Sequence, residues 1–330
     1  MRIRLIGKAN GVGLSRDIEL LAAALRACGC QVTLRGCDKP DRKRRRNMLT
    51  RLAARLRGRW RGAGHAVGAN GYDVNLMLEH VWPQFLHEAA CNVLVPNPEW
   101  FDRRDLAFLG SAERIWAKTA LAEALFAARG SQVVRIGFDS CDRHDGAVTR
   151  ELRFLHLAGR SPLKGTARLH ALWLKHPEWP TLTIVQDAAP TGSASNVTVH
   201  RGYLDDAALR TLQNAHRFHV CTSEAEGWGH YIAEAMSVGA VTFTCDAAPM
   251  NELIGAERGV LVAAHDGPVH NLATLRLFDE RGLEAAVERT LTLGATHWDA
   301  TGAAARHWFL DNKHGFVARI ARAVDELRRR

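Results

Sequence analysis

The sequence has no long apolar run. Nowhere in its 330 residues does an uninterrupted apolar stretch approach the roughly 18 to 20 residues that cross a bilayer. Residues 1–7 have the pattern of a strand entering a loop, whereas a signal peptide has a basic end followed by an apolar centre. We therefore expect a cytoplasmic protein without a membrane-spanning segment.

Cysteine occurs without any recognisable arrangement. The seven cysteines are an odd number, and no two are separated by two residues, as they would be in a zinc ribbon. This argues against both a disulfide framework and a structural metal site. We expect most of these cysteines to be buried as small apolar side chains.

Two common nucleotide-binding motifs are also missing. After the first predicted strand, Gly7, Gly11 and Gly13 are spaced G-x3-G-x-G rather than G-x-G-x-x-G, and G-x4-G-K-[ST] occurs nowhere. Neither a dinucleotide-dependent dehydrogenase nor a P-loop enzyme is favoured. Because this loop opens a helix, Gly11 and Gly13 are still candidates to approach a phosphate. The alternative is a turn that contacts no ligand.

Positive charge is abundant and unevenly placed. The formal net charge is +9, and residues 39–62 hold eleven Lys or Arg residues against one Asp. Leu49, Leu52, Leu56 and Trp60 recur there at helical spacing, so a basic amphipathic helix on an anionic membrane surface is one interpretation. A solvated loop is the second, and nucleic acid is the least favoured partner.

Short strand patterns alternate with helical patterns along the chain, which predicts an α/β protein with two doubly wound, Rossmann-like parallel sheets. Each sheet has six predicted strands: 2–6, 31–35, 74–78, 92–95, 114–117 and 132–136 in the first, and 154–158, 182–185, 197–200, 218–222, 241–245 and 260–262 in the second. A polar linker at 139–150 separates them. We expect a first domain at 1–148, a second at 149–310, and a helix at 311–330 that returns to the first.

The residues after the predicted strand 218–222 have a pattern suited to a nucleotide sugar. Gly227 and Gly229 let the backbone approach a ligand, and the helix that follows offers its amino end to a phosphate. Glu226 precedes the turn, while His230 and Glu234 share one face of the helix. Carboxylates suit the hydroxyl groups of a sugar or a ribose. The alternative is a set of solvated helix charges, with His230 as a capping or packing residue.

This stretch resembles the family 4 retaining glycosyltransferases, whose signature E-x7-E corresponds here to Glu226 and Glu234. Three further segments are similar to family motifs in the expected order: the Arg and Lys pair in 157–165, the segment 196–209, and Glu-Leu-Ile within 249–254. Together they cover nearly all of residues 150 to 262. The resemblance implies the GT-B fold, in which two Rossmann-like domains face a central cleft.

The resemblance also implies roles for individual residues. Arg160 and Lys164 would neutralise the donor diphosphate and, with Glu226, form the catalytic set, without a metal or any cofactor besides the donor sugar nucleotide. Glu234 would hold the ribose. The donor-binding candidates are Gly227, Trp228, Gly229, His230, Tyr231 and Glu234, to which the loop glycines Gly11 and Gly13 are added.

Polar residues after two strands of the first half are candidates for the acceptor side. They are His80, Asn97 and Glu99. Family members often carry a histidine where this chain has Asn97 and Glu99, so His80 is considered as a substitute. A packed, hydrogen-bonded His80 is the alternative, and Thr119 is expected at least to cap a helix.

Together these features predict a hexosyltransferase that moves a sugar from a nucleoside diphosphate sugar to an acceptor hydroxyl with retention of configuration. A lipid-linked saccharide or lipopolysaccharide at the inner membrane face is the expected acceptor, in polysaccharide biosynthesis. An inverting GT-B transferase, a sugar-nucleotide epimerase, and a non-catalytic protein that binds sugar nucleotides or polyanions are the alternatives.

Overall fold

The computed structural model describes residues 1–9, 11, 13–41, 71–188, 192, 194–202 and 204–329. They form two compact units, Met1–Phe138 with His314–Arg330 and Asp139–Lys313. The first division, after Phe138, lies ten residues before the boundary expected after residue 148. The second, after Lys313, lies three residues beyond the boundary expected after residue 310. The long helix α9 (Ala295–Arg328) contributes to both units. Most of the basic segment, residues 42–62, lies outside the described residues, and with it the predicted amphipathic helix.

The first unit contains a six-stranded parallel sheet in the order β2-β1-β3-β4-β5-β6. Within the described residues, right-handed crossovers in opposite directions place the helix after β1 and the helix after β5 on opposite faces of the sheet. The elements are β1 (Arg2–Gly7), α1 (Gly13–Ala27), β2 (Gln31–Gly36), β3 (Tyr72–Leu78), the 3-10 helix η1 (Pro83–Phe85), β4 (Ala89–Val95), the 3-10 helix η2 (Arg103–Ser111), β5 (Arg114–Ala117), α3 (Ala120–Ala127) and β6 (Val133–Arg135).

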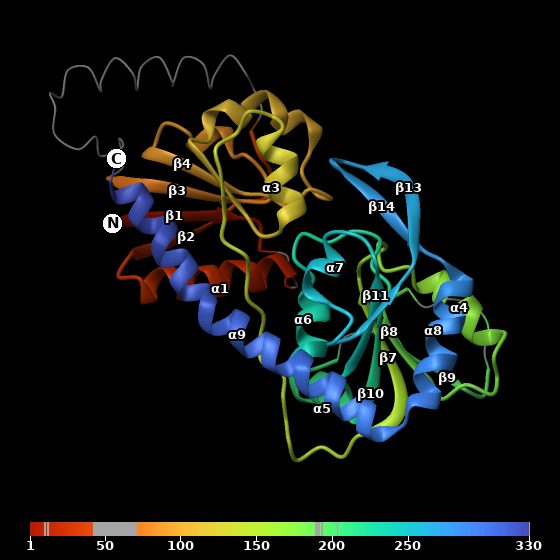
Figure 1. Ribbon diagram of the computed structural model, residues 1–330. Coiled ribbons are helices and arrows are strands. Elements are labelled where there is room, and N and C mark those ends of the chain that lie inside the picture. Colours follow the sequence, from red (N-terminus) through yellow and green to blue (C-terminus); the bar gives the residue numbers. More distant parts are fainter. Residues whose placement is uncertain are drawn as a thin grey trace, which may run out of the picture. The chain divides into compact units, whose positions relative to one another are not determined.

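The second unit repeats this plan with the order β12-β11-β10-β7-β8-β9, again all parallel. Helices α4 and α6 lie on opposite sides of this sheet (Figure 1). The elements are β7 (Glu151–Gly159), α4 (Thr166–Leu174), β8 (Leu182–Gln186), β9 (Val197–His200), α5 (Asp206–Ala215), β10 (His216–Cys221), α6 (His230–Ser237), β11 (Val241–Cys245), α7 (Met250–Leu253), β12 (Val260–Val262) and α8 (Glu280–Leu293). The expected α/β class and both strand sets are confirmed.

Each sheet has a point where the strand order reverses. In the first unit the reversal lies between β1 and β3, and in the second it lies between β7 and β10. Ligands of doubly wound sheets bind beyond the carboxyl ends of the strands at such a point. The loops that follow β7 and β10 are therefore the first place to look for a site in the second unit.

Aromatic side chains fill the core of the second sheet. The ring of Phe154 stacks on Phe218 at 4.6 Å between centroids and meets the edge of Trp173 at 4.9 Å. All three are fully buried. Truncating such a residue to alanine costs about 3–5 kcal/mol, so the strands beneath the loops are held firmly in register.

An antiparallel hairpin, β13 (Ala264–His270) with β14 (Ala273–Phe278), projects from the second unit (Figure 1). The sequence patterns did not predict it, because β13 is mostly polar and contains Gly267 and Pro268, which are unusual within a strand. Leu275 of β14 packs in a buried cluster with Leu163 and Ala225. The backbone N–H of Arg276 donates to the carbonyl of Glu224 at 2.7 Å. The hairpin thus supports the loops that follow β7 and β10.

The cysteines depart from expectation. None of the seven, all of which lie within the described residues, forms a disulfide; only three are buried, and the other four are half-buried. The expectation that most would be buried was wrong, because several lie at the ends of strands and helices, where neighbouring loops cover them only in part.

Candidate active site

An ion pair joins the loops that follow the two strands at the reversal point of the second sheet. The Lys164 ammonium group contacts Oε1 of Glu226 and lies 3.2 Å from the hydroxyl of Ser223. Both charged side chains are mostly covered, at 13% and 12% exposure. The Ser223 hydroxyl donates to the same Glu226 oxygen. The structure therefore brings together Lys164 and Glu226, as the sequence predicted, and adds Ser223.

Tyr231, in the first turn of α6, completes this cluster. The Lys164 nitrogen lies 3.9 Å from the centre of the Tyr231 ring, and the Tyr231 hydroxyl lies 2.6 Å from that of Ser223. Since the Ser223 hydrogen points to Glu226, Tyr231 is the donor in this contact. Burial raises the pKa of Tyr231 well above its ordinary value, so this phenol stays protonated.

A close backbone contact explains why Lys164 lies over the end of β10. Gly165 precedes α4 with φ of +66°, and a Cβ atom there would lie 2.9 Å from the carbonyl oxygen of Thr222. Only glycine permits both the left-handed conformation and this approach. The Thr222 hydroxyl also donates to the Lys164 carbonyl at 2.9 Å. The two loops are thereby fastened together.

Arg160 occupies a different position from Lys164. Its Nε donates to Oδ2 of Asp187 at 2.8 Å, and the side chain is 68% exposed. An exposed pair of this kind is worth little in stability, about 0–1 kcal/mol, so an anionic ligand can recruit the arginine at small cost. The structure thus leaves Arg160 at the rim of the loop that carries Lys164.

The amino end of α6 has the geometry of a phosphate-binding turn. Gly229 adopts φ of +99° as the residue that caps the helix, so a side chain there would be strained. The Ser140 hydroxyl lies 2.9 Å from Nδ1 of His230 and accepts the indole N–H of Trp228 at 3.1 Å. The residues on both sides of Gly229 are thereby held by one serine, which the sequence patterns did not single out.

Glu234 lies in a separate network from Glu226. Its side chain is 3% exposed, and its Oε2 accepts a hydrogen bond from the Gln213 amide at 3.0 Å. Gln213 in turn accepts from Nε of Arg143 at 2.9 Å. Arg143 belongs to the segment predicted as a polar linker, yet it is 6% exposed and packed into the second unit.

A neutral histidine underlies the loop that carries Lys164. His156 is fully buried, with Nδ1 2.7 Å from the Val220 carbonyl and Nε2 2.9 Å from the Thr166 hydroxyl. A carbonyl only accepts, so Nδ1 carries the proton and Thr166 donates to Nε2. Burial lowers the pKa of His156 to about 4. It is therefore a packed, uncharged support.

The first unit has its own polar cluster at the carboxyl ends of its strands. Lys118, directly after β5, pairs with Asp17 of α1 and donates to Oδ1 of Asn97 at 2.9 Å. Lys118 and Asp17 are 2% and 4% exposed. Glu79, after β3, has φ of +63°, and burial raises its pKa. Asn97 is thus bound within a buried, charge-balanced cluster.

His80, Glu99 and the glycine loop lie around the same edge of the first sheet. His80 Nδ1 is 3.1 Å from Oδ2 of Asp105, a fully buried carboxylate, and its Nε2 is 3.6 Å from Glu79. Glu99 is 4% exposed.

Gly11, with φ of +74°, donates from its N–H to the Ser15 hydroxyl at 2.8 Å, and Gly13 begins α1. Thr119 caps α3 as expected, accepting from the Ala122 N–H at 3.2 Å.

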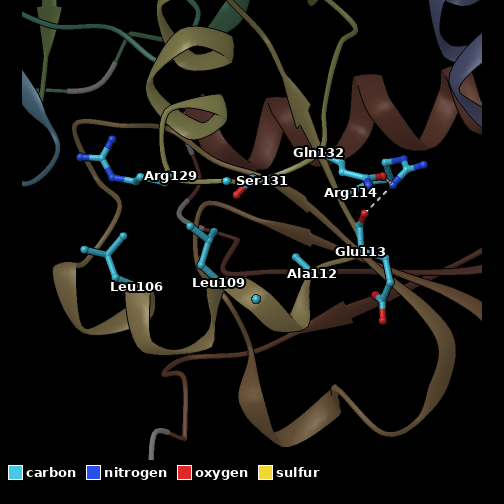
Figure 2. Close-up of a pocket in the computed structure, with 10 residues that line it drawn as sticks. Leu106, Leu109, Ala112, Glu113, Arg114, Arg129, Ser131 and Gln132 are labelled. Atoms are coloured by element: carbon cyan, nitrogen blue, oxygen red, sulfur yellow. Dashed lines mark hydrogen bonds between the residues drawn. The ribbon is translucent and has the colours of Figure 1, made fainter.

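A separate hollow of about 610 Å³ lies at the other edge of the first sheet, at the amino ends of β5 and β6. Figure 2 shows Arg129 and Leu106 on one side of it and Arg114 with Glu113 and Gln132 on the other. None of the site residues predicted from the sequence lines it. Its arginines are engaged, since Arg129 donates to the Leu125 carbonyl at 2.6 Å and Arg114 to that of Glu113 at 2.9 Å.

The described residues lack two features. They contain no group of three or more His, Cys, Asp or Glu side chains placed to hold a metal ion. Within the same ranges, no helix has the length and apolar character to cross a membrane.

Comparison with known structures identifies the architecture. Sucrose-phosphate synthase from Thermosynechococcus elongatus superimposes with a TM-score of 0.73 at 15% identity, covering 99% of this chain and 98% of that one. A glycosyltransferase from Rickettsia africae gives 0.71 at 13% identity, with the same coverage. Anabaena HepE in complex with UDP and glucose gives 0.67 at 14%, covering 98% of this chain and 99% of that one.

The fold is GT-B. This confirms the fold that the resemblance implied. No protein-family model matches the sequence, and no curated protein matches it significantly. Identities of 13–15% establish the fold alone, so the activity has to be argued from the site.

Proposed function

We propose that this protein is a retaining glycosyltransferase that transfers a sugar from a nucleoside diphosphate sugar to an acceptor hydroxyl. The observation that carries the proposal is the Lys164–Glu226 pair, joined by Ser223 and Tyr231, at the reversal point of a Rossmann-order sheet. The HepE complex with UDP and glucose shows that a protein of this fold can hold such ligands, which supports the proposal.

The donor is assigned to the second unit by charge. Lys164 and Arg160 are the cations that receive the diphosphate, with the amino end of α6 offering its backbone amides around Gly229. Glu226, already next to Lys164, accepts hydrogen bonds from the hydroxyls of the transferred sugar. Glu234 takes the ribose diol.

In the proposed reaction the bond between the anomeric carbon and the diphosphate oxygen breaks with its electron pair staying on oxygen. The acceptor oxygen attacks the same face of the anomeric carbon, and its proton passes to the departing phosphate oxygen. Negative charge therefore grows on the diphosphate, where Lys164 and Arg160 stabilise it. This step needs neither a metal nor a protein nucleophile.

The acceptor is assigned to the first unit, with His80, Asn97 and Glu99 as its polar residues. The high positive charge of residues 39–62 supports an acceptor presented on an anionic membrane, such as a lipid-linked saccharide or lipopolysaccharide. Cell-surface polysaccharide synthesis by a peripheral protein at the inner membrane face would follow. Flotation with anionic liposomes tests this: deleting residues 42–62 abolishes binding if the proposal holds, and unchanged binding contradicts it.

A second mechanism is favoured by one observation, the His80–Asp105 pair at 3.1 Å. A histidine oriented by a buried carboxylate is a competent general base, and such a base serves an inverting transferase. The configuration of the product, determined by NMR, separates the two mechanisms. A retained anomer supports the phosphate-assisted route, whereas an inverted anomer assigns the chemistry to His80.

Binding and turnover test the proposal as a whole. Thermal-shift screening with UDP, GDP, ADP and TDP sugars should reveal one donor that raises the melting temperature. Donor hydrolysis or transfer should then fall in Glu226→Gln, but not in the matched control Glu224→Gln, whose carboxylate belongs to the same loop and lies outside the Lys164 cluster. Equal activity of Glu226→Gln and the wild type would remove Glu226 from the mechanism.

A further inference from the structure

Gln213 connects the carboxylate of Glu234 to a buried arginine. The residue lies in the last turn of α5 and is fully buried. Its Nε2 donates to Oε2 of Glu234 at 3.0 Å, and its Oε1 accepts from Nε of Arg143 at 2.9 Å. A glutamine in this position has one polar neighbour at each end of its amide.

The two neighbours allow one orientation of the amide. A guanidinium group only donates and a carboxylate only accepts, so the amide oxygen must face Arg143 and the nitrogen must face Glu234. Reversing the amide would place its nitrogen, a donor, against the guanidinium of Arg143 and its oxygen, an acceptor, against the carboxylate of Glu234. Both contacts would be unfavourable in this buried place. The hydrogen-bond direction is therefore fixed by chemistry.

Arg143 is itself held from several sides. Its Nη1 pairs with Oδ1 of Asp206 at 2.6 Å, and its Nη2 donates to the Asp206 carbonyl at 3.0 Å. Its backbone N–H donates to the Ser237 hydroxyl at 3.0 Å, which donates to the Glu234 carbonyl at 2.7 Å. The arginine thus anchors both the glutamine and the helix that carries Glu234.

We propose that Gln213, oriented by Arg143, is a positioning residue that sets the Glu234 carboxylate for the ribose hydroxyls of the donor. This inference rests on the proposed function, since it assigns a ribose to Glu234. Binding a diol through two hydrogen bonds needs a carboxylate plane with a defined direction. A neutral amide supplies that direction and leaves the negative charge of Glu234 available to attract the hydroxyl donors. An arginine or lysine in direct contact would neutralise this charge.

The test compares two buried amides on the same helix. Gln213→Met removes the bond to Glu234 at nearly constant volume. Asn214→Leu is the matched control, because Asn214 is also buried and donates to the Arg143 carbonyl at 2.7 Å, but it bonds to the backbone and does not contact Glu234. Affinities are measured for UDP, GDP and ADP, and for the 2′,3′-dideoxy analogue of the nucleotide that wild type binds best.

Gln213→Met should weaken binding of the ribonucleotide about tenfold while leaving the dideoxy analogue unchanged. Asn214→Leu should affect both nucleotides equally. If Gln213→Met does not fold, Gln213→Asn keeps a buried amide but shortens the side chain by one methylene, which withdraws its donor from Glu234, and it should show the same selective loss. Wild-type affinity and selectivity in these variants would overturn the inference alone. If wild type binds neither these three nucleotides nor TDP, the proposed function fails and the inference fails with it. Binding of TDP alone, which lacks the 2′-hydroxyl, would overturn the inference and leave the proposed function standing.

Discussion

Each unit places a lysine in the segment that follows the carboxyl end of a parallel strand, but the two lysines have different surroundings. Lys118 in the first unit is 2% exposed and paired with a carboxylate that is 4% exposed. Lys164 in the second unit is 13% exposed, pairs with a carboxylate that is 12% exposed, and has the exposed Arg160 four residues before it. The two lysines also differ in place, since Lys118 follows β5, next to the edge strand β6, whereas Lys164 follows β7, at the reversal point of its sheet.

The difference shows how a charge becomes available for binding. Lys118 is enclosed by Asp17, Asn97 and the ring of Phe138, whose centre is 4.5 Å from the ammonium nitrogen. Its charge is balanced inside the protein, so its role is structural. Lys164 retains access to solvent, so an incoming diphosphate can share it with Glu226. Four experiments test this contrast.

The largest effect is expected when Lys118 is replaced by methionine. This leaves Asp17 as an uncompensated buried carboxylate, which costs roughly 3–5 kcal/mol of unfolding free energy. Urea denaturation measures the loss. The double variant Lys118→Met with Asp17→Asn should recover part of it, because the unpaired charge is gone. A single variant as stable as wild type would show that the first cluster is not structural.

Lys164→Met should instead lower activity. Removing one preorganised donor to the developing charge costs about 10²–10³-fold in kcat. The melting temperature should change little, since Glu226 keeps its hydrogen bond from Ser223. Steady-state kinetics and a thermal melt on the same preparation give both values. A kcat within threefold of wild type would show that Lys164, like Lys118, has only a structural role.

Acidification should weaken the second unit. Burial lowers the pKa of His156 to about 4 and that of His219 to about 3. As pH falls below 6.5, these two histidines therefore become protonated in the unfolded chain while they stay neutral in the folded protein. Stability falls as pH drops from 6.5 towards 4, by about 2 kcal/mol for each histidine at pH 5.

In the first unit, one group contributes to stability with the opposite pH dependence. Burial raises the pKa of Glu79, so its contribution to stability grows as pH falls. Hydrogen exchange at pH 8 and pH 5 should therefore show protection decreasing more in β7 and β10 than in β1 and β3. An equal decrease in both sheets contradicts this assignment, and His156→Leu should reduce the pH dependence in β7.

Two glycines give the smallest contrast. Gly11 and Gly165 both have positive φ, but a Cβ on Gly11 would meet nothing within 4 Å, whereas one on Gly165 would meet the Thr222 oxygen at 2.9 Å. Gly11→Ala should cost about 1–2 kcal/mol for the backbone conformation alone. Gly165→Ala should cost more and should also weaken donor binding, because it displaces Lys164. Denaturation and nucleotide titration check both. Equal losses would mean that the contact at Thr222 is easily relieved.

The sequence predicted the strands well for a local reason. Short runs rich in β-branched and apolar residues, such as 241–245 and 260–262, coincide with β11 and β12, because buried parallel strands favour such side chains. The hairpin 264–278 was missed, since Gly267 and Pro268 interrupt its first strand. Arg143 was assigned to a polar linker, because its burial depends on Asp206 and Gln213, which are 63 and 70 residues further along the chain.

The sequence by itself determined the order of strands and helices, the glycines that permit tight turns, and the residue types of the candidate site. These follow from side-chain periodicity and backbone sterics within a few residues. The folded structure is needed for Lys164 to meet Glu226 across 62 residues of chain and for Ser223 to join them. It is also needed for Gln213 to contact Glu234 and for Lys118 to be enclosed. Those facts depend on which strands become neighbours, because an ion pair forms only where the folded sheet brings its members within a few ångströms.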